Sequence, residues 1–284
     1  MLIVHGPEEL RAYVRGRRAA GGQVALVPTM GALHRGHGEL IRAAAKVAEN
    51  VVVSVYVNPR QFNVTSDFEK YPRDLGSDVA AAAASGATVV YAPDDSAMYP
   101  AGFDTTVSVR RVAAPLEGAG RPGHFDGVAT IVAKLLNACE PDAAVFGLKD
   151  YQQVAVVRRM VRDLDMGVRI LAVDTVRETD GLALSSRNVR LSPQDRADAP
   201  VIHRGLVRAR ELLELGEEAS TAREEFLAVV GGSGRSRVEY VSVADPDTLA
   251  EIEGPAPRAV ISCAVWFGDV RLIDNLLHGV PVTP

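Results

Sequence analysis

The sequence has 284 residues, of which 47% are apolar and 24% charged, values typical of a folded globular chain and far from those of a disordered one. This length allows one large domain or two modest ones. The 31 basic and 36 acidic residues give a net charge of −5, so no overall basic field attracts a nucleic-acid backbone.

The sequence pattern indicates no membrane span, no secretory signal and no disulfide or zinc site. The uncharged, Ala-rich stretch of residues 79–93 is too short and too interrupted to supply the ~20 apolar residues of a membrane span. Charged residues interrupt the segment where a secretory signal would be apolar. Cys139 and Cys263 lie far apart, without zinc-site or disulfide spacing, and we expect both to be small buried residues. We therefore expect a cytoplasmic protein with no membrane or nucleic-acid partner.

Apolar, β-branched segments alternate with helical patterns over the first part of the chain. Residues 51–57 are too apolar to have one wet face, which indicates a strand buried on both sides. We predict strands over residues 23–27, 51–57, 88–92, 143–146 and 168–173, and helices over residues 39–48, 78–85, 127–138 and 151–164. The alternation predicts an α/β fold with a doubly wound parallel, Rossmann-like sheet in residues 1–176.

The pattern changes after residue 176. Ser192 before Pro193, with an acid in the first turn, predicts a helix that starts there and runs toward Leu215. A second helix fits residues 222–230, and short strands fit residues 238–243, 259–266 and 270–273. We therefore expect a smaller C-terminal α+β domain over residues 177–284.

The loop after the first predicted strand, residues 28–37, is a candidate ligand site because ligands of open α/β sheets bind beyond the carboxyl ends of the strands. Gly31 and Gly36 allow close backbone approach, and the next helix offers an anion its positive end. His34 and His37 could donate to phosphate oxygens there. They could also be ordinary surface histidines or, with a carboxylate, a metal pair. The spacing matches neither the dinucleotide fingerprint nor the P-loop.

Three further features offer polar groups near strand ends. Asn58 and Gln61 have uncharged donors and acceptors suited to a hydroxylated small molecule, although each could be an ordinary loop residue. Lys134 is one of four lysines among 31 basic residues, and this uncommon choice favours a specific anion contact, with a solvated flank residue as the alternative. Lys149 and Gln153 lie four residues apart, so a phosphate contact and a substrate contact could share one cleft.

Two of these segments also have simple structural explanations. Asp150 and Gln153 have the spacing of a capping box, which predicts helix initiation. Residues 181–188 carry two hydroxyls and a guanidinium that could cover a triphosphate from the side opposite the histidines. On its own, the segment of residues 181–188 is typical of a turn.

Together, six segments resemble the pantothenate synthetases, in that family's order: residues 28–37, 57–62, 71–73, 121–128, 149–153 and 185–188. These enzymes are ATP-dependent ligases that join pantoate to β-alanine, within the wider superfamily of nucleotidylyltransferases and class I aminoacyl-tRNA synthetases. A lone His-x-Gly-His segment would indicate only the superfamily, whereas the whole set is specific. The similarity covers nearly the entire chain.

The resemblance implies an ATP site in the larger domain, completed by the loop at the junction with the smaller one. Its residues would be Pro28, Thr29, Met30, Gly31, His34, His37, Gly147, Lys149, Asp150, Val176, Leu184, Ser185, Ser186 and Arg187. The catalytic groups among them, which would bind phosphates and steady the developing charge, would be His34, His37, Lys149, Ser185, Ser186 and Arg187. Asp150 would bind the ribose.

The resemblance also implies a pocket for pantoate and β-alanine, formed by Met30, Asn58, Gln61, Tyr71, Arg121, His124, Lys134 and Gln153. Gln61 and Gln153 would hold the pantoate hydroxyls and carboxylate. Asp78 matches a family acid near Mg²⁺, and a homodimer is expected. The chain departs from many relatives at Leu148, Leu184 and Gly38, where they have Glu, Met and Leu, which affects the rim of the pocket.

The implied reaction activates a carboxylate that otherwise lacks a leaving group. Pantoate would attack the α-phosphorus of Mg²⁺-bound ATP, pyrophosphate would depart, and β-alanine would attack the pantoyl adenylate to give pantothenate, on the route to coenzyme A. Such a transfer needs positioning and positive charge more than a protein nucleophile, and the sequence shows no Ser-His-Asp or Cys-His set. The smaller domain would act as a lid that excludes water.

Two alternatives to this reaction stay open. The first is an adenylyltransferase that transfers AMP to a phosphate acceptor, although the uncharged Gln61 and Gln153 argue against an acceptor that would favour more cations. The second is a nucleotide-binding regulatory protein without turnover, which Lys149, His34 and His37 disfavour.

Overall fold

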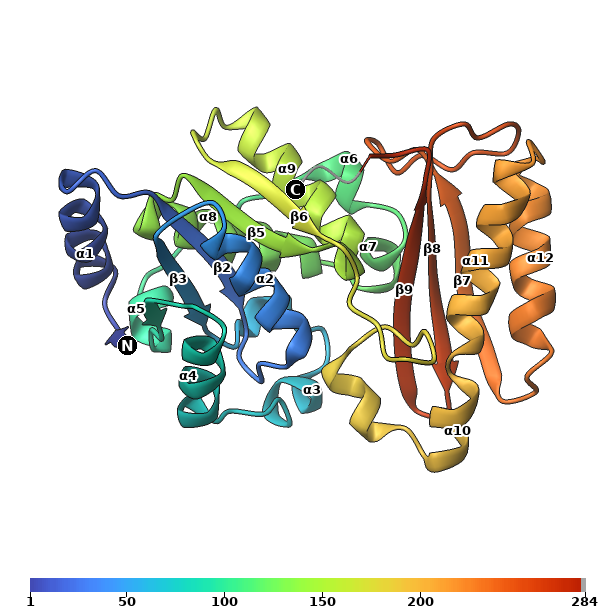
Figure 1. Ribbon diagram of the computed structural model, residues 1–284, viewed down its shortest axis with the longest axis horizontal. Helices are drawn as coiled ribbons and strands as arrows, with labels where there is room; N and C mark the ends of the chain where they lie inside the picture. Colours follow the sequence, from blue (N-terminus) through green and yellow to red (C-terminus); the bar gives the residue numbers. More distant parts are fainter. Residues whose placement is uncertain (282–284) are drawn as a thin grey trace.

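The computed structural model describes residues 1–281 and contains two sheets with helices packed around them (Figure 1). The strands of the larger sheet are β1 (Leu2–Val4), β2 (Val24–Thr29), β3 (Asn50–Val55), β4 (Val89–Tyr91), β5 (Ala143–Gly147) and β6 (Arg169–Val173). All neighbouring strands are parallel, in the order β1-β4-β3-β2-β5-β6. The predicted α/β fold with a doubly wound parallel sheet is confirmed.

Helices cover both faces of this sheet. The longer ones are α1 (Pro7–Ala19), α2 (Arg35–Ala45), α4 (Leu75–Ala84), α8 (His124–Cys139) and α9 (Tyr151–Asp163), and shorter turns are η1 (Pro59–Gln61), α3 (Thr65–Glu69), α5 (Asp95–Met98), α6 (Arg110–Ala113), α7 (Glu117–Gly120) and η2 (Leu148–Asp150). In β3, Val52 packs toward α1, α8 and α9, whereas Val51 and Val53 pack toward α2 and α4. This strand is therefore buried on both sides, as its composition predicts.

The strand order reverses between β2 and β5. From β2 the chain continues to β3 and then β4 on one side, while β5 lies on the other side of β2. The loops that follow β2 and β5 therefore flank one crevice at the carboxyl edge of the sheet. The first of these loops carries His34, and the second carries Lys149.

The smaller lobe contains an antiparallel sheet of β7 (Ser236–Ala244), β8 (Ala259–Phe267) and β9 (Val270–His278), with α11 (Val201–Glu214) and α12 (Ala219–Gly231) on one face (Figure 1). It also includes η3 (Ser186–Arg190) and α10 (Pro193–Asp198). Ser192 caps α10 as predicted, accepting from the Asp195 N–H at 3.1 Å. The prediction of one continuous helix toward Leu215 is wrong. Two helices, α10 and α11, form instead, because Pro200 between them has no N–H to donate.

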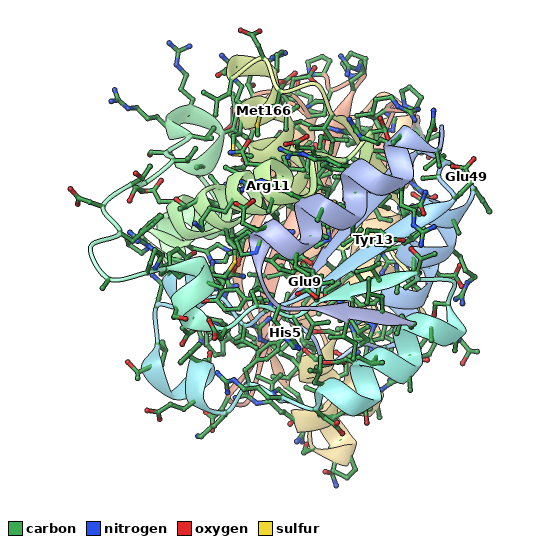
Figure 2. All side chains as sticks on the ribbon, turned by 90° about the vertical axis from the view of Figure 1, so that its left-hand side faces the viewer. His5, Glu9, Arg11, Tyr13, Glu49 and Met166 are labelled. Atoms are coloured by element: carbon green, nitrogen blue, oxygen red, sulfur yellow. The ribbon has the colours of Figure 1, made fainter. Side chains whose placement is uncertain are left out.

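Three further elements differ from the sequence predictions. The last strand does not end at Ile273 but continues to His278 through Asp274 and Asn275, which are only 4% and 5% exposed. At the other end of the chain, the unpredicted β1 and α1 extend the sheet and cover it. Figure 2 looks onto this side, where Tyr13 of α1 donates to the Asn50 side chain at 3.3 Å.

Within residues 1–281, no helix combines the length and the apolar character needed to cross a bilayer.

The division of the chain into two domains at residues 176/177 stays a prediction. The parallel strands all lie before residue 174, and the antiparallel ones all lie after residue 235.

Candidate functional site

Helix α2 begins at the histidine pair, four residues earlier than predicted. His34 is the N-cap, and its Nδ1 accepts from the Gly36 N–H at 3.1 Å. The Nδ1 of His37 accepts from the His34 N–H at 3.2 Å, and the two ring centroids are 4.1 Å apart. A ring nitrogen that accepts carries no proton, so each neutral imidazole holds its proton on Nε2. The cap therefore creates two adjacent Nε2–H donors.

These imidazoles are neutral donors rather than cations near pH 7. Burial lowers the pKa of His37 to about 3, and the neighbouring His34 also acts to lower it. Burial and the charge of Lys149 both lower the pKa of His34. The cation whose charge acts on both rings is Lys149, so hydrogen bonding and charge come from separate groups.

The loop between β2 and α2 is held by a buried carboxylate. Asp78 is 4% exposed and accepts from the backbone N–H groups of Ala32 at 3.1 Å and Leu33 at 2.7 Å. Gly31 has φ +85°, and a Cβ there would lie 2.7 Å from Asp78 Oδ2. Asp78 therefore supports the loop that carries the histidines.

No dedicated metal site is evident in the described part of the chain, where no three or more His, Cys, Asp or Glu side chains group to hold an ion. Both Asp78 oxygens already accept N–H groups. Mg²⁺ in such sites is bound largely by substrate phosphates, with one or two carboxylates. These residues fit a metal that arrives with the nucleotide, and the placement of Asp78 near Mg²⁺ stays a prediction.

Lys149 lies between two adjoining cavities. The larger is also lined by Arg121, His124, Asp150 and Gln153. The smaller is also lined by Ser185, Arg187 and Asn188. Residues predicted from separate segments to bind phosphate and substrate therefore meet at this ammonium.

Asp150 precedes α9 but makes no side-chain cap, so the predicted capping box with Gln153 is wrong. Its carboxylate instead lies 3.8 Å from Lys149 Nζ, half exposed to solvent. The preceding η2 turn leads directly into α9, with Asp150 at φ −104° and ψ 58°. The carboxylate is therefore available to a ligand.

The segment after β6 closes on itself beside α2. The Leu184 N–H donates to the Val176 carbonyl at 2.9 Å, so these two residues lie side by side. Arg35, the first residue of α2, donates to the Arg177 carbonyl at 2.8 Å. The structure thus brings the predicted ATP-binding segments 28–37 and 176–187 to the same crevice.

On the substrate side, Asn58 orients Gln61. Asn58 is 1% exposed, and its Nδ2 donates to Gln61 Oε1 at 2.9 Å and to the Gly127 carbonyl at 3.1 Å. Its Oδ1 accepts from the Tyr99 hydroxyl at 2.8 Å. Because Gln61 Oε1 is occupied, the Gln61 Nε2 donors remain for a ligand.

The backbone of Gln61 is fixed from the start of α8. His124 Nδ1 lies 2.8 Å from the Gln61 carbonyl oxygen, and Arg121 Nη2 donates to the same oxygen at 3.2 Å. A carbonyl only accepts, so the His124 proton is on Nδ1 and its Nε2 accepts from Arg121 Nη1 at 3.2 Å. Burial, followed by the Arg121 charge, lowers the pKa of His124 to about 4.

Tyr71 and Lys134 have different positions relative to this site. Burial raises the pKa of Tyr71 to about 12, and the Arg187 charge acts in the opposite direction, which places the phenol near that guanidinium. Lys134 lies elsewhere, on a separate cavity that Arg11 also lines, with Nζ 4.8 Å from the Phe103 ring centroid. Its ammonium also lies 6.0 Å from the ring centroid of Tyr99, whose hydroxyl donates to Asn58, and the substrate role of Lys134 stays a prediction.

The contact between the lobes includes residues that the sequence did not indicate. Glu117 is 6% exposed and accepts from Arg271 Nη1 and Nη2 of β9 at 2.7 and 2.8 Å. It also accepts from the Tyr240 hydroxyl of β7 at 2.9 Å. The segment around Glu117 is rich in Gly and Ala and has no periodicity, so no sequence signal marks it. A buried ion pair therefore joins the lobes at the wall of the larger cavity.

A family model described as pantoate-beta-alanine ligase matches residues 2–277. This chain belongs to the pantoate–β-alanine ligase family. The resemblance found in the six sequence segments is thereby confirmed. Among curated ligases of this kind, the pantothenate synthetase of Moorella thermoacetica is 47% identical over 94% of this chain and 95% of its own length.

Solved structures of pantoate–β-alanine ligases match the whole fold. The pantothenate synthetase of Thermus thermophilus has a TM-score of 0.92 and 44% identity, covering 99% of this chain and 100% of its own. The ligase of Francisella tularensis, in complex with beta-gamma ATP and β-alanine, has a TM-score of 0.81, 31% identity and full coverage of both chains. The shared fold includes both lobes.

Proposed function

We infer that this ligase condenses pantoate with β-alanine, using ATP, in the crevice between β2 and β5. The observation that carries the inference is the position of Lys149, which lines both the cavity of the predicted substrate residues and that of the predicted phosphate residues. The Francisella relative in complex with an ATP species and β-alanine supports the same substrates.

The ATP side of the crevice suits an in-line transfer to a carboxylate. A pantoate carboxylate oxygen forms a bond to the α-phosphorus while the bond to the pyrophosphate oxygen breaks. Lys149 and Arg187 would offset the charge that spreads onto the departing phosphates, and the Nε2–H groups of His34 and His37 would donate to their oxygens. Ser185 and Ser186 would add hydroxyl donors, Asp150 would bind the ribose, and MgATP is the substrate form.

The pantoate side relies on uncharged donors. Gln61 presents its Nε2 group because Asn58 occupies its Oε1, and Gln153 lines the same cavity as Lys149. Amides bind a carboxylate more weakly than a guanidinium or an ammonium does, so they can hold pantoate without neutralising the nucleophile. This property favours acyl adenylate formation over transfer of AMP to a phosphate acceptor.

In the second step, the free amine of β-alanine attacks the acyl carbon of the adenylate, loses a proton and displaces AMP. The mixed anhydride must be shielded from water during this step. The C-terminal lobe lies over the larger cavity and contributes Tyr240 and Asn275 to its lining. We propose that this lobe limits water access, and that the ligase works as a cytoplasmic homodimer.

Product analysis tests this function. Purified protein with ATP, Mg²⁺, pantoate and β-alanine should release pantothenate, AMP and pyrophosphate in equal amounts, and pyrophosphate release should require pantoate. Lys149→Ala should slow adenylate formation by ~10²–10³-fold without unfolding the protein. The matched control is Lys46→Ala, which removes an exposed lysine at the other end of α2. ADP as a product would contradict the proposed reaction.

A further inference from the structure

Lys149 is carried by a backbone segment that the other lobe holds in place. Asn275 of β9 donates its two Nδ2 hydrogens to the carbonyl oxygens of Leu148 and Lys149, at 2.8 and 2.9 Å. These bonds join residues 127 and 126 positions apart in the sequence. Asn275 is 5% exposed, so water does not replace these bonds when they are lost.

The neighbouring residue fixes Asn275 itself. The Asn275 backbone N–H donates to Asp274 Oδ1 at 2.8 Å, and Arg177 makes two bonds to the Asp274 carboxylate, at 2.6 and 3.0 Å. Arg177 also donates to the Asn275 carbonyl at 3.2 Å. The pair Asp274–Asn275 therefore contacts both the Lys149 turn and the segment that follows Val176.

A purely structural role does not explain why an acid and an amide occupy positions 274 and 275. The pair interrupts the apolar strand β9 at two buried positions, where a β-branched residue would pack without the need for partners. An amide is the side chain that can donate twice to neighbouring carbonyls while remaining uncharged. The carbonyls it binds belong to η2, the short turn that sets the direction of Lys149.

We propose that Asn275 is a positioning residue for catalysis: from the C-terminal lobe, it fixes the backbone of Leu148 and Lys149 so that the Lys149 ammonium lies between the substrate and phosphate cavities. This inference rests on the proposed function, in which Lys149 stabilises the transferring phosphoryl group. It makes the docking of the two lobes a condition for an aligned ammonium. Asn275 acts through Lys149 and need not touch the reacting atoms.

The test uses Asn275→Asp, which keeps the shape of the side chain but has no hydrogens to donate once ionised, and Asn275→Ala. The matched control is Asn50→Asp, because Asn50 is a buried asparagine whose Nδ2 donates to the Gln23 carbonyl at 3.0 Å, away from the Lys149 turn. Pantoate-dependent adenylate formation is measured in single turnovers, at a temperature where each variant is folded by circular dichroism.

We expect the adenylation rate to fall ~10²-fold in both Asn275 variants, the size typical of a small displacement of a catalytic group, with the KM for pantoate within about twofold of the wild type. Asn50→Asp should lower the melting temperature and leave the rate unchanged. In a Lys149→Ala background, Asn275→Ala should change the rate by less than about threefold, because the two residues act as a unit.

Three results would overturn the inference: wild-type rates in folded Asn275 variants, a full additional loss in the Lys149→Ala background, or failure of both Asn275 variants to fold, which would assign the residue to lobe folding. These results differ from a failure of the proposed function, in which the wild-type protein itself would form no adenylate.

Discussion

Asn58 Nδ2 lies 2.9 Å from Gln61 Oε1, and this bond decides which atoms of the Gln61 amide remain free for other partners. Asn58 donates its second hydrogen to the Gly127 carbonyl and accepts from Tyr99, so it has no spare donor for a ligand. In the proposed site, Asn58 would therefore serve pantoate binding through Gln61, whereas the sequence alone suggests that it borders the pocket directly.

Reversing this bond should weaken pantoate binding. Asn58→Asp presents an acceptor where a donor stood, so the Gln61 amide would turn its Nε2 group toward residue 58 and no longer offer it to pantoate. We expect the Kd for pantoate to rise ~10–100-fold, the effect of one lost or mispaired buried bond. Isothermal titration with pantoate measures it. In a Gln61→Ala background the same change should add little, and a full additional effect there would show that Asn58 acts independently of Gln61.

The neutral histidines lead to a pH prediction for the free enzyme. Because the pKa of His37 is about 3 and that of His34 is lowered by burial, neither ring should lose a required proton between pH 6 and 8. We expect kcat/KM for MgATP in the pantoate-dependent half-reaction to vary less than about twofold over this range. Omitting β-alanine removes the titration of its amine from the measurement. A decline with an apparent pKa near 6.5 would mean that an imidazolium is required.

Gly31 should tolerate no side chain. Alanine at φ +85° costs ~1–2 kcal/mol of conformational strain, and its Cβ would clash with Asp78, adding ~1–3 kcal/mol of overpacking. Gly21 is the control, since it has φ +81° with nothing within 4 Å of an added methyl group. Chemical denaturation should show a larger loss for Gly31→Ala than for Gly21→Ala. Equal losses would mean that the Asp78 contact relaxes freely.

The ion pair between the lobes should behave as a buried pair. Arg271→Met would leave the Glu117 carboxylate buried with the Tyr240 hydroxyl and a distant Arg121, at a cost of ~3–5 kcal/mol in the free energy of unfolding. Adding Glu117→Gln removes the unpaired charge and should recover most of that loss. Denaturant titration of both variants checks this. A double variant no more stable than Arg271→Met would contradict it.

Acid should destabilise the protein through His124. In the unfolded chain this imidazole binds a proton near pH 6.5, but in the folded protein it does so only near pH 4. Between these values the unfolded state binds more protons, so stability falls as the pH is lowered, by at most ~1.4 kcal/mol per pH unit. His124→Asn keeps a donor toward the Gln61 carbonyl and does not titrate. The stability difference between the two proteins should therefore change with pH in this range, and a constant difference would refute the assignment.

The sequence predicts the parallel sheet and the crevice because their signals are local. Alternating apolar strands and helices specify the fold, and the segments around His34 and Lys149 lie at strand ends that the topology brings together. A helix start at residue 39 is too late because the histidines themselves form the cap, and imidazole is not among the usual capping groups.

The missed features depend on contacts between distant residues. From the sequence, Asp274 and Asn275 indicate the end of a strand, because buried polar residues need hydrogen-bond partners. Those partners are Arg177 and the η2 carbonyls, which are distant in sequence and therefore not visible there. The cavity that Lys134 lines was not predicted either, because its residue type is unusual in this sequence but does not show which way a helix position faces.

The fate of the pantoate carboxylate oxygen shows directly whether an acyl adenylate forms in this crevice. Pantoate labelled with ¹⁸O in its carboxylate is converted with ATP and β-alanine, and the AMP is analysed by mass spectrometry. Attack of the carboxylate on the α-phosphorus predicts one ¹⁸O atom in each AMP. Unlabelled AMP, with all of the label kept in pantothenate or released to water, would contradict an acyl adenylate formed in this crevice.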